Sequence, residues 1–138
     1  MFELVVERSF PAAHAVTMKG RAEETHDHLW RVAVTVAGRQ LDADGLLCDF
    51  HAIERRLAEV VDPLRGADLN RTPPFDRVNP TAEAVARHIA QRIAPALPEG
   101  VALRSVAVTE ARGCTAVYRP KKRRSDGATK RRRAGIAD

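Results

Sequence analysis

The sequence predicts an α+β fold in which an antiparallel sheet is covered on one face by two helices. Three observations lead to this prediction. Apolar residues alternate with polar ones in two segments near the N-terminus, recur at helical spacing in two middle segments, and form two further strand-like runs after residue 100. The resulting order, ββααββ, places the helices on one face of the sheet. With 138 residues, the chain has room for one such domain.

The first two strands are predicted from alternation with a period of two. Residues 2–10 place Phe2, Leu4, Val6 and Phe10 on one face, and we expect this strand to be broken at Pro11. Residues 30–36 repeat the pattern with Trp30, Val32, Val34 and Val36. Both segments are typical of an antiparallel sheet with one covered side.

Two helices follow, each with a start and a stop signal. The turn residues 42–45 lead into apolar residues 46–48, which we interpret as a short strand, and Asp49 is the expected N-cap of a helix that stops at Pro63. The second helix starts after residues 79–81, carries one apolar stripe from Ala82 to Leu97, and ends before Pro98.

The last two strands are predicted at residues 101–110 and 115–118, separated by a turn at residues 112–113. The domain is therefore expected to cover residues 1–119. Residues 120–138 lack any apolar period and are predicted to be a disordered basic tail. This tail holds eight of the 23 Lys and Arg residues from residue 121 onward, so the domain itself is close to neutral. We therefore expect no nucleic-acid partner, unless the tail provides the contact.

Cysteine content and hydropathy indicate the compartment. Cys48 and Cys114 are the only cysteines, which argues against a disulfide scaffold and favours a reducing cytoplasm. Acidic residues interrupt the apolar N-terminus, and no apolar run is long enough to span a membrane. We expect a cytoplasmic protein without a membrane partner.

Three of the five histidines flank the first two predicted strands. His14 follows the first strand, and His26 and His28 precede the second with a spacing that turns both imidazoles to one side of an extended backbone. Three neutral imidazoles suit zinc and leave its fourth position open, which is typical of a catalytic site. The spacing alone is equally compatible with a chance surface pair and a loop position for His14.

Further motifs occur in a recognisable order along the chain. They are Phe10, Ala12-Ala13-His14, His26-x-His28, Gly45, Asp49-Phe50, Leu69-Asn70, Asn79-Pro80-Thr81-x-Glu83, Thr109-Glu110 and Tyr118. In this order they resemble the 6-pyruvoyltetrahydropterin and 6-carboxytetrahydropterin synthase family over roughly residues 2–119.

The resemblance implies a tunnelling fold that assembles into homotrimers or homohexamers, with active sites between subunits. It implies a zinc-dependent lyase that converts dihydroneopterin triphosphate, or a related dihydropterin, to a tetrahydropterin. His14, His26 and His28 match the zinc ligands, and Glu110 matches the glutamate that anchors the pterin ring. Thr81 matches a threonine near that ring, and it is equally suited to cap the second helix.

The chain departs from the family pattern in three places. The cysteine base that normally precedes the histidine pair is absent, the assisting Asp-His pair is absent before Leu69, and Asp27 replaces a glycine. Glu23 lies three residues before His26, as in a variant branch of the family in which glutamate replaces the cysteine. We therefore predict Glu23 as the general base, with Glu24 as the alternative. Both glutamates are also compatible with a solvated loop.

The leading functional prediction is a zinc-dependent pterin enzyme of the 6-carboxytetrahydropterin synthase type. Its pathway, whether towards the deazapurine of queuosine, towards folate or towards another pterin, is left open by the sequence. A glutamate-type variant that releases 6-hydroxymethyl-dihydropterin is the alternative. A second alternative is a catalytically silent subunit that binds pterin.

Overall fold

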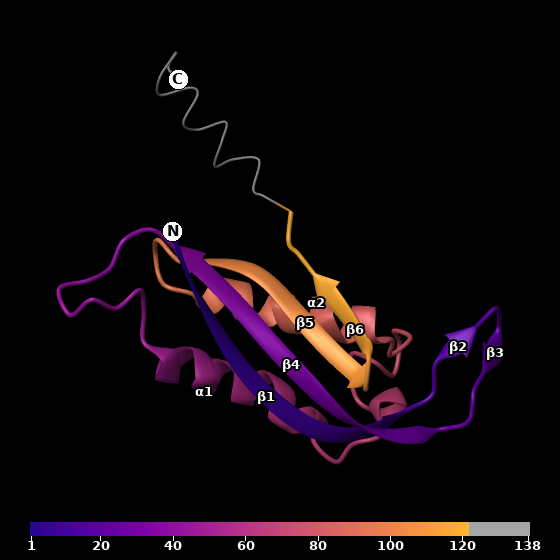
Figure 1. The fold of residues 1–138 in the computed structure, drawn as a ribbon. Helices are drawn as coiled ribbons and strands as arrows, with labels where there is room; N and C mark the ends of the chain where they lie inside the picture. The colour runs from indigo at the N-terminus through magenta and orange to yellow at the C-terminus, as the bar shows by residue number, and fades with distance from the viewer. Residues whose placement is uncertain (122–138) are drawn as a thin grey trace.

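A computed structural model describes residues 1–121, and its main sheet has four antiparallel strands (Figure 1). The strands are β1 (Phe2–His14), β4 (His26–Gly38), β5 (Ala102–Ala111) and β6 (Cys114–Tyr118), and they are arranged in the order β1-β4-β5-β6. The predicted antiparallel sheet is therefore confirmed. Most of the predicted basic tail, residues 122–138, lies outside the described residues.

Two helices connect the first and second pairs of strands and lie on one face of the sheet (Figure 1). α1 (Phe50–Val61) packs against β1, and α2 (Ala82–Ile93) packs against β5 and β6. Asp49 and Thr81 are their N-caps, as predicted, because each side chain accepts a backbone N–H of the first turn. Short 3₁₀ helices lie at Asp62–Leu64, Leu69–Arg71 and Ala94–Ala96.

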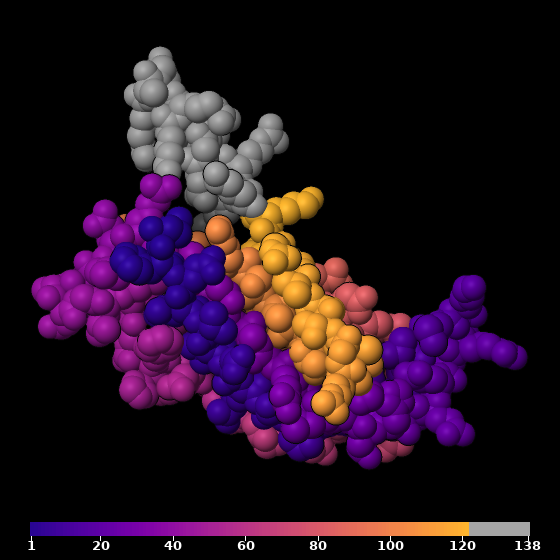
Figure 2. Space-filling view, in the orientation of Figure 1, coloured from indigo at the N-terminus to yellow at the C-terminus, as the bar shows by residue number. Residues whose placement is uncertain are grey.

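The core lies between the helices and the inner face of the sheet. Trp30 and Phe10 are fully buried at its centre, with parallel rings whose centroids are 6.1 Å apart. The predicted inward residues of the second strand, Val32, Val34 and Val36, are at most 1% exposed. The opposite face of the sheet is open, and Figure 2 looks onto it. Val5, Leu29 and Val117 are each about half exposed there.

The prediction that the first strand breaks at Pro11 is wrong. β1 continues to His14, and Pro11 pairs with Leu29 of β4. The carbonyl oxygen of Pro11 points to the outer edge of β1, where it accepts the N–H of Gly66. The nitrogen of a strand residue faces the same edge as its carbonyl, so the ladder to β4 loses no hydrogen bond at Pro11.

The short strand predicted at residues 46–48 is not formed. These residues follow a turn that is closed by Asp42, whose carboxylate accepts the N–H groups of Asp44 and Leu46. Both edges of β4, the strand that precedes this segment, are occupied by β1 and β5, so the segment cannot fold back and pair with it. Apolar character alone was a misleading signal here.

A small ribbon that the alternation did not predict joins the first two long strands. β2 (Thr17–Met18) and β3 (Arg21–Ala22) pair across a turn in which Lys19 and Gly20 both have positive φ. The ribbon projects beyond one end of the main sheet (Figure 1). Among the described residues, no helix has both the length and the apolar character needed to cross a membrane.

Candidate metal centre

The pairing of β1 with β4 brings three histidines together. His14 is the direct cross-strand partner of His26, and Ala12 is that of His28, so the three imidazoles share one face. One ring nitrogen from each histidine lies within 4.8 Å of the other two. Antiparallel pairing of the two strands therefore places His14 beside His26 and His28.

Hydrogen bonds fix which nitrogen of two of these rings is free. The Nδ1 atom of His14 lies 2.7 Å from the carbonyl oxygen of Pro80, and the Nδ1 atom of His26 lies 2.9 Å from that of Glu24. A carbonyl only accepts, so each Nδ1 carries the hydrogen. In the neutral imidazole, each Nε2 atom then presents a lone pair to the centre of the cluster.

The cluster has the properties of a cation site. His14 is fully buried, and the Nε2 atoms of His14 and His28 are buried without a hydrogen-bond partner among the described residues. Burial lowers the pKa of His28, which favours its neutral, ligating form. Buried nitrogen atoms without partners cost free energy, and a metal ion satisfies them. The three imidazoles therefore fit zinc, which prefers nitrogen donors of this type.

Trp30 packs against two of the imidazoles. Its ring lies edge-on to those of His14 and His28, with centroid distances of 4.8 Å and 5.9 Å. Its indole N–H donates to the carbonyl oxygen of Ala12 at 3.1 Å, which fixes the ring. The sequence identified Trp30 as a core residue, and only the structure places it against the metal ligands.

Two carboxylates border the imidazoles. The oxygens of Glu110 lie 3.6 Å from His14 Nε2 and 3.7 Å from His28 Nε2, and Glu23 Oε1 lies 3.7 Å from His26 Nε2. Glu24 is exposed and offers the cluster its backbone carbonyl. The structure therefore brings Glu23, but not the Glu24 carboxylate, to the histidines.

Thr81 is linked to the site by the preceding residue, Pro80, whose carbonyl oxygen contacts His14. Its hydroxyl accepts the N–H of Ala84 at 3.0 Å, while the preceding Pro80 carbonyl holds His14. The start of α2 therefore fixes one metal-ligand candidate and carries one of the two residues predicted to bind pterin.

The family model described as 6-pyruvoyl tetrahydropterin synthase matches residues 3–121, which is most of the chain. The chain belongs to the 6-pyruvoyl tetrahydropterin synthase family. The predicted resemblance is thereby confirmed.

Two curated relatives of this family member carry the names of pterin enzymes. A dihydroneopterin monophosphate aldolase of Pyrococcus furiosus is 34% identical over 107 residues, which are 78% of this chain and 88% of the relative. A 6-carboxy-5,6,7,8-tetrahydropterin synthase of Bacillus subtilis is 32% identical over 127 residues, which are 88% of this chain and 87% of the relative.

Solved structures support the fold. The 6-pyruvoyl tetrahydropterin synthase of Caenorhabditis elegans superposes with a TM-score of 0.74 at 20% identity, over 88% of this chain and 98% of the other. A Plasmodium vivax 6-pyruvoyltetrahydropterin synthase, in which a glutamate described as a catalytic residue is replaced by alanine, superposes with a TM-score of 0.69 at 15% identity and the same coverage. This family member therefore adopts the tunnelling fold.

The segment between His14 and Glu23 is held by two asparagine side chains to which the sequence assigned no role at the site. Asn70 bonds both backbone groups of Ala15, and Asn79 bonds both of Thr17. Between them, the Val16 N–H donates to Glu23 Oε1, and the Glu23 N–H donates to the Val16 carbonyl. In the sequence, the only sign of these contacts was the presence of Asn70 after Leu69 and of Asn79 before Pro80.

The remaining histidines and cysteines lie elsewhere in this family member. His51 is largely exposed beside Asp49. His88, on α2, packs against Phe75, and burial lowers the pKa of His88. Cys114 is exposed at the start of β6. Neither a cysteine nor a fourth histidine of the described residues joins the cluster, so neither residue type replaces the usual base and its relay there.

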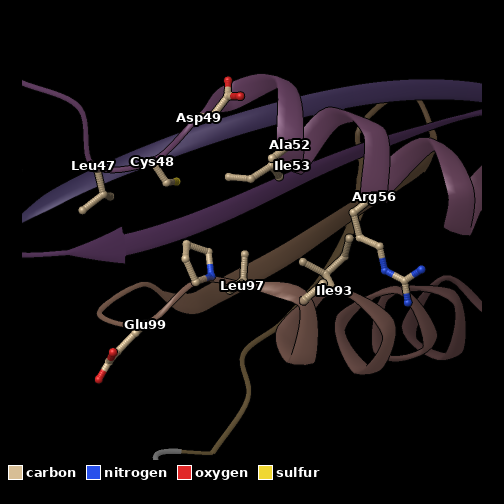
Figure 3. Close-up of a pocket in the computed structure, with 11 residues that line it drawn as sticks. Leu47, Cys48, Asp49, Ala52, Ile53, Arg56, Ile93, Leu97 and Glu99 are labelled. Atoms are coloured by element: carbon tan, nitrogen blue, oxygen red, sulfur yellow. The ribbon is translucent and has the colours of Figure 1, made fainter. Parts of the chain in front are cut away.

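Cys48 lines a separate apolar cavity of about 450 Å³ between the N-terminal end of α1 and the C-terminal end of α2 (Figure 3). Burial raises the pKa of its thiol. Leu47, on the cavity wall, contacts Gly38, which lies at the opposite end of β4 from His26. The cavity is therefore about the length of a long strand away from the histidines.

Proposed function

We propose that this protein is a zinc-dependent enzyme that acts on the side chain of a dihydroneopterin phosphate. The observation that carries the proposal is that three imidazole nitrogens and two carboxylates lie together where β1 ends and β4 begins. His14, His26 and His28 would hold the zinc ion. When bound there, zinc would polarise substrate oxygens and make a neighbouring proton easier to remove.

Glu23 is the proposed general base. Its Oε1 atom accepts the Val16 N–H at 3.0 Å, which positions the carboxylate and leaves Oε2 free to accept a proton. Glu24 is exposed and its carboxylate makes no contact with the cluster, which argues against it as the base. The glutamate described as catalytic in the Plasmodium vivax enzyme supports the idea that a glutamate can serve in this family.

Glu110 and Thr81 are the proposed contacts to the pterin ring. A carboxylate can accept two hydrogen bonds from the adjacent amino and ring N–H groups of a pterin. The Thr81 oxygen accepts the helix N–H, so its own hydrogen is available to an acceptor on the ring. Glu110, near the end of β5, lies 3.6 Å from His14 Nε2, and Thr81 follows Pro80, whose carbonyl oxygen lies 2.7 Å from His14 Nδ1.

The branch of the reaction is proposed from the same residues. The usual cysteine is absent and Glu23 stands beside His26, which favours the glutamate-type reaction that releases 6-hydroxymethyl-dihydropterin. The Pyrococcus furiosus relative, named as an aldolase of dihydroneopterin monophosphate, supports this branch. The Bacillus subtilis relative supports the alternative, a 6-carboxytetrahydropterin synthase that acts on the triphosphate.

Assembly into a homotrimer or homohexamer is part of the proposal. β6 pairs only with β5, and the outer edge of β1 pairs only with residues 66–68, near its C-terminal end, among the described residues. Unpaired edges and an open sheet face are surfaces that other subunits can cover. Light scattering after size exclusion would test this, and a monomer at micromolar concentration would contradict it.

The function is tested by zinc analysis and by incubation with dihydroneopterin, its monophosphate and its triphosphate, with products read by mass. We expect one zinc per chain and release of 6-hydroxymethyl-dihydropterin. Glu23→Gln keeps an acceptor for the Val16 N–H and removes the base, so turnover should fall by about 10²–10⁴-fold. Glu24→Gln should stay near the wild-type rate; if instead it alone abolished turnover, the base would be misassigned.

Two outcomes would replace the proposed function. Zinc with bound but unchanged pterin from all three substrates would indicate the catalytically silent subunit. A tetrahydropterin product from the triphosphate would indicate the synthase branch. A purified protein that binds no zinc at all would contradict the proposal as a whole.

A further inference from the structure

Glu110 faces two of the three histidines of the cluster. Its Oε1 atom is 3.6 Å from His14 Nε2 and its Oε2 atom is 3.7 Å from His28 Nε2, so one carboxylate faces two imidazoles at once. The side chain is 27% exposed, while that of His14 is fully buried. Glu110 is therefore the solvent-accessible partner of a buried imidazole.

The His14 nitrogen and the Glu110 oxygen that face one another are both acceptors. The His14 hydrogen is on Nδ1, because that atom bonds the Pro80 carbonyl, so His14 Nε2 directs a lone pair towards Glu110. The Nε2 atom of His28, which faces the other Glu110 oxygen, is buried and has no hydrogen-bond partner among the described residues. Acceptors held this close, with no hydrogen between them, repel one another unless a cation lies among them.

The distances fit shared coordination better than hydrogen bonding. Separations of 3.6 Å and 3.7 Å are longer than an N–H···O hydrogen bond, which spans about 2.7–3.2 Å. With bonds of about 2.0–2.1 Å, two ligand atoms of a tetrahedral zinc site lie roughly 3.3–3.4 Å apart. Each Glu110 oxygen therefore already lies within a few tenths of an ångström of that spacing from one histidine nitrogen.

We propose that the Glu110 carboxylate is the fourth metal ligand in the substrate-free protein and leaves the metal when the pterin ring binds. This inference rests on the proposed function, because it assumes that the three histidines hold zinc and that Glu110 contacts the ring. The carboxylate exchanges one cationic partner for the ring N–H groups. Recognition of the ring then opens the coordination position that the substrate side chain needs.

This exchange has a thermodynamic consequence that a fixed pterin anchor does not have. Ring binding removes a metal ligand, so a pterin without side-chain oxygens should weaken metal binding, and the metal should weaken binding of that pterin by the same factor. A pterin with a dihydroxylated side chain replaces the lost ligand. Metal affinity should therefore be weakened by 7,8-dihydropterin and restored by 7,8-dihydroneopterin.

The experiment uses the full chain loaded with Co²⁺ or Zn²⁺. Metal affinity is measured by competition with a chelator, and the visible Co²⁺ spectrum reports coordination, each with and without the two pterins. Glu110→Gln removes the charged ligand and keeps the shape. Glu54→Gln, an exposed change on α1, controls for loss of one negative charge. Glu110→Asp keeps the carboxylate but shortens its reach, and circular dichroism checks the fold of each variant.

We expect Glu110→Gln to weaken Zn²⁺ binding by at least about tenfold, a usual effect of losing a group that supports a metal. The Co²⁺ spectrum of this variant should match that of the wild type with 7,8-dihydropterin, and the coupling to 7,8-dihydropterin should vanish. Glu110→Asp should lie between the two, and it decides the question if Glu110→Gln does not fold.

Metal affinity and spectra equal to those of Glu54→Gln would overturn the inference. If Glu110→Gln then still lost pterin binding, Glu110 would be an anchor only and the proposed function would stand. A wild-type protein that bound neither metal would refute the proposed function itself, and the inference with it.

Discussion

Asn79 clamps Thr17 across the site. Its side-chain oxygen accepts the Thr17 N–H at 2.9 Å and its amide nitrogen donates to the Thr17 carbonyl at 2.8 Å, although the two residues are 62 positions apart. Asn70 makes the same pair of bonds to Ala15, at 2.8 Å and 2.9 Å. These clamps hold the only segment that connects His14 to Glu23. The distance between a metal-ligand candidate and the proposed base therefore depends on residues that touch neither.

Replacing Asn79 should separate zinc binding from turnover. Asn79→Ala removes both bonds to Thr17, so we expect faster amide exchange in residues 15–23 and a fall in kcat, while zinc content stays at the wild-type level. Asn79→Asp keeps the acceptor and loses the donor, and should lie between the two. Unchanged exchange in Asn79→Ala would show that the clamp is dispensable.

Trp30 should report metal binding directly. It is the only tryptophan, and its ring lies 4.8 Å from that of His14. Addition of Zn²⁺ to the metal-free protein should change its fluorescence with a one-to-one endpoint, because the charge near the indole changes. A titration without any change in fluorescence, in protein that binds zinc by mass, would contradict the packing described here.

Trp30→Phe is expected to destabilise the fold. The variant leaves the Ala12 carbonyl without the indole N–H that it accepts at 3.1 Å. Loss of one hydrogen bond costs about 0.5–1.5 kcal/mol, and the smaller ring adds a cavity. Urea unfolding would measure the loss, with Phe10→Leu as a core change that spares this hydrogen bond. Equal effects of both variants would indicate that packing alone matters.

Thr81 allows its two roles to be separated. Thr81→Ala removes the N-cap of α2 and should cost about 1 kcal/mol of stability, while Thr81→Ser keeps the hydroxyl and should be close to wild type. Under the proposed function, Thr81→Ala should also raise the KM for the pterin substrate. An unchanged KM together with the stability loss would leave Thr81 as a cap only.

Acid should destabilise the metal-free protein below about pH 6.5. Burial lowers the pKa of both His28 and His88 in the folded state, whereas an unfolded histidine titrates near about 6.5. The unfolded chain therefore binds more protons as the pH falls, and the stability that is complete above this range is lost below it.

His88→Gln provides the control for this pH dependence, because glutamine does not titrate. Its unfolding free energy should fall less steeply between about pH 7 and pH 5 than that of the wild type. Parallel slopes for the two proteins would assign the acid sensitivity to His28 or to other groups. Zinc should also be released over this range, because protonated imidazoles do not bind metal.

Much of the fold was predictable because its signals are local. The Asp49 and Thr81 caps, the two apolar helix faces and the alternation around Trp30 each depend on residues a few positions apart. Pro11 misled the prediction because its effect depends on which edge of β1 its nitrogen faces. The strand predicted at residues 46–48 failed because both edges of β4, the strand that precedes it in the chain, are occupied by β1 and β5.

By itself, the sequence determined the donors: three histidines at spacings that antiparallel strands can bring together, and acidic residues close to them. The tertiary structure decided how each group is used. Glu23 lies beside His26 while Glu24 offers only its carbonyl, Glu110 faces His14 and His28, and Pro80 fixes the His14 tautomer. These relationships join residues up to about a hundred positions apart, and no local pattern encodes them, because burial and hydrogen bonding arise only when the chain is packed.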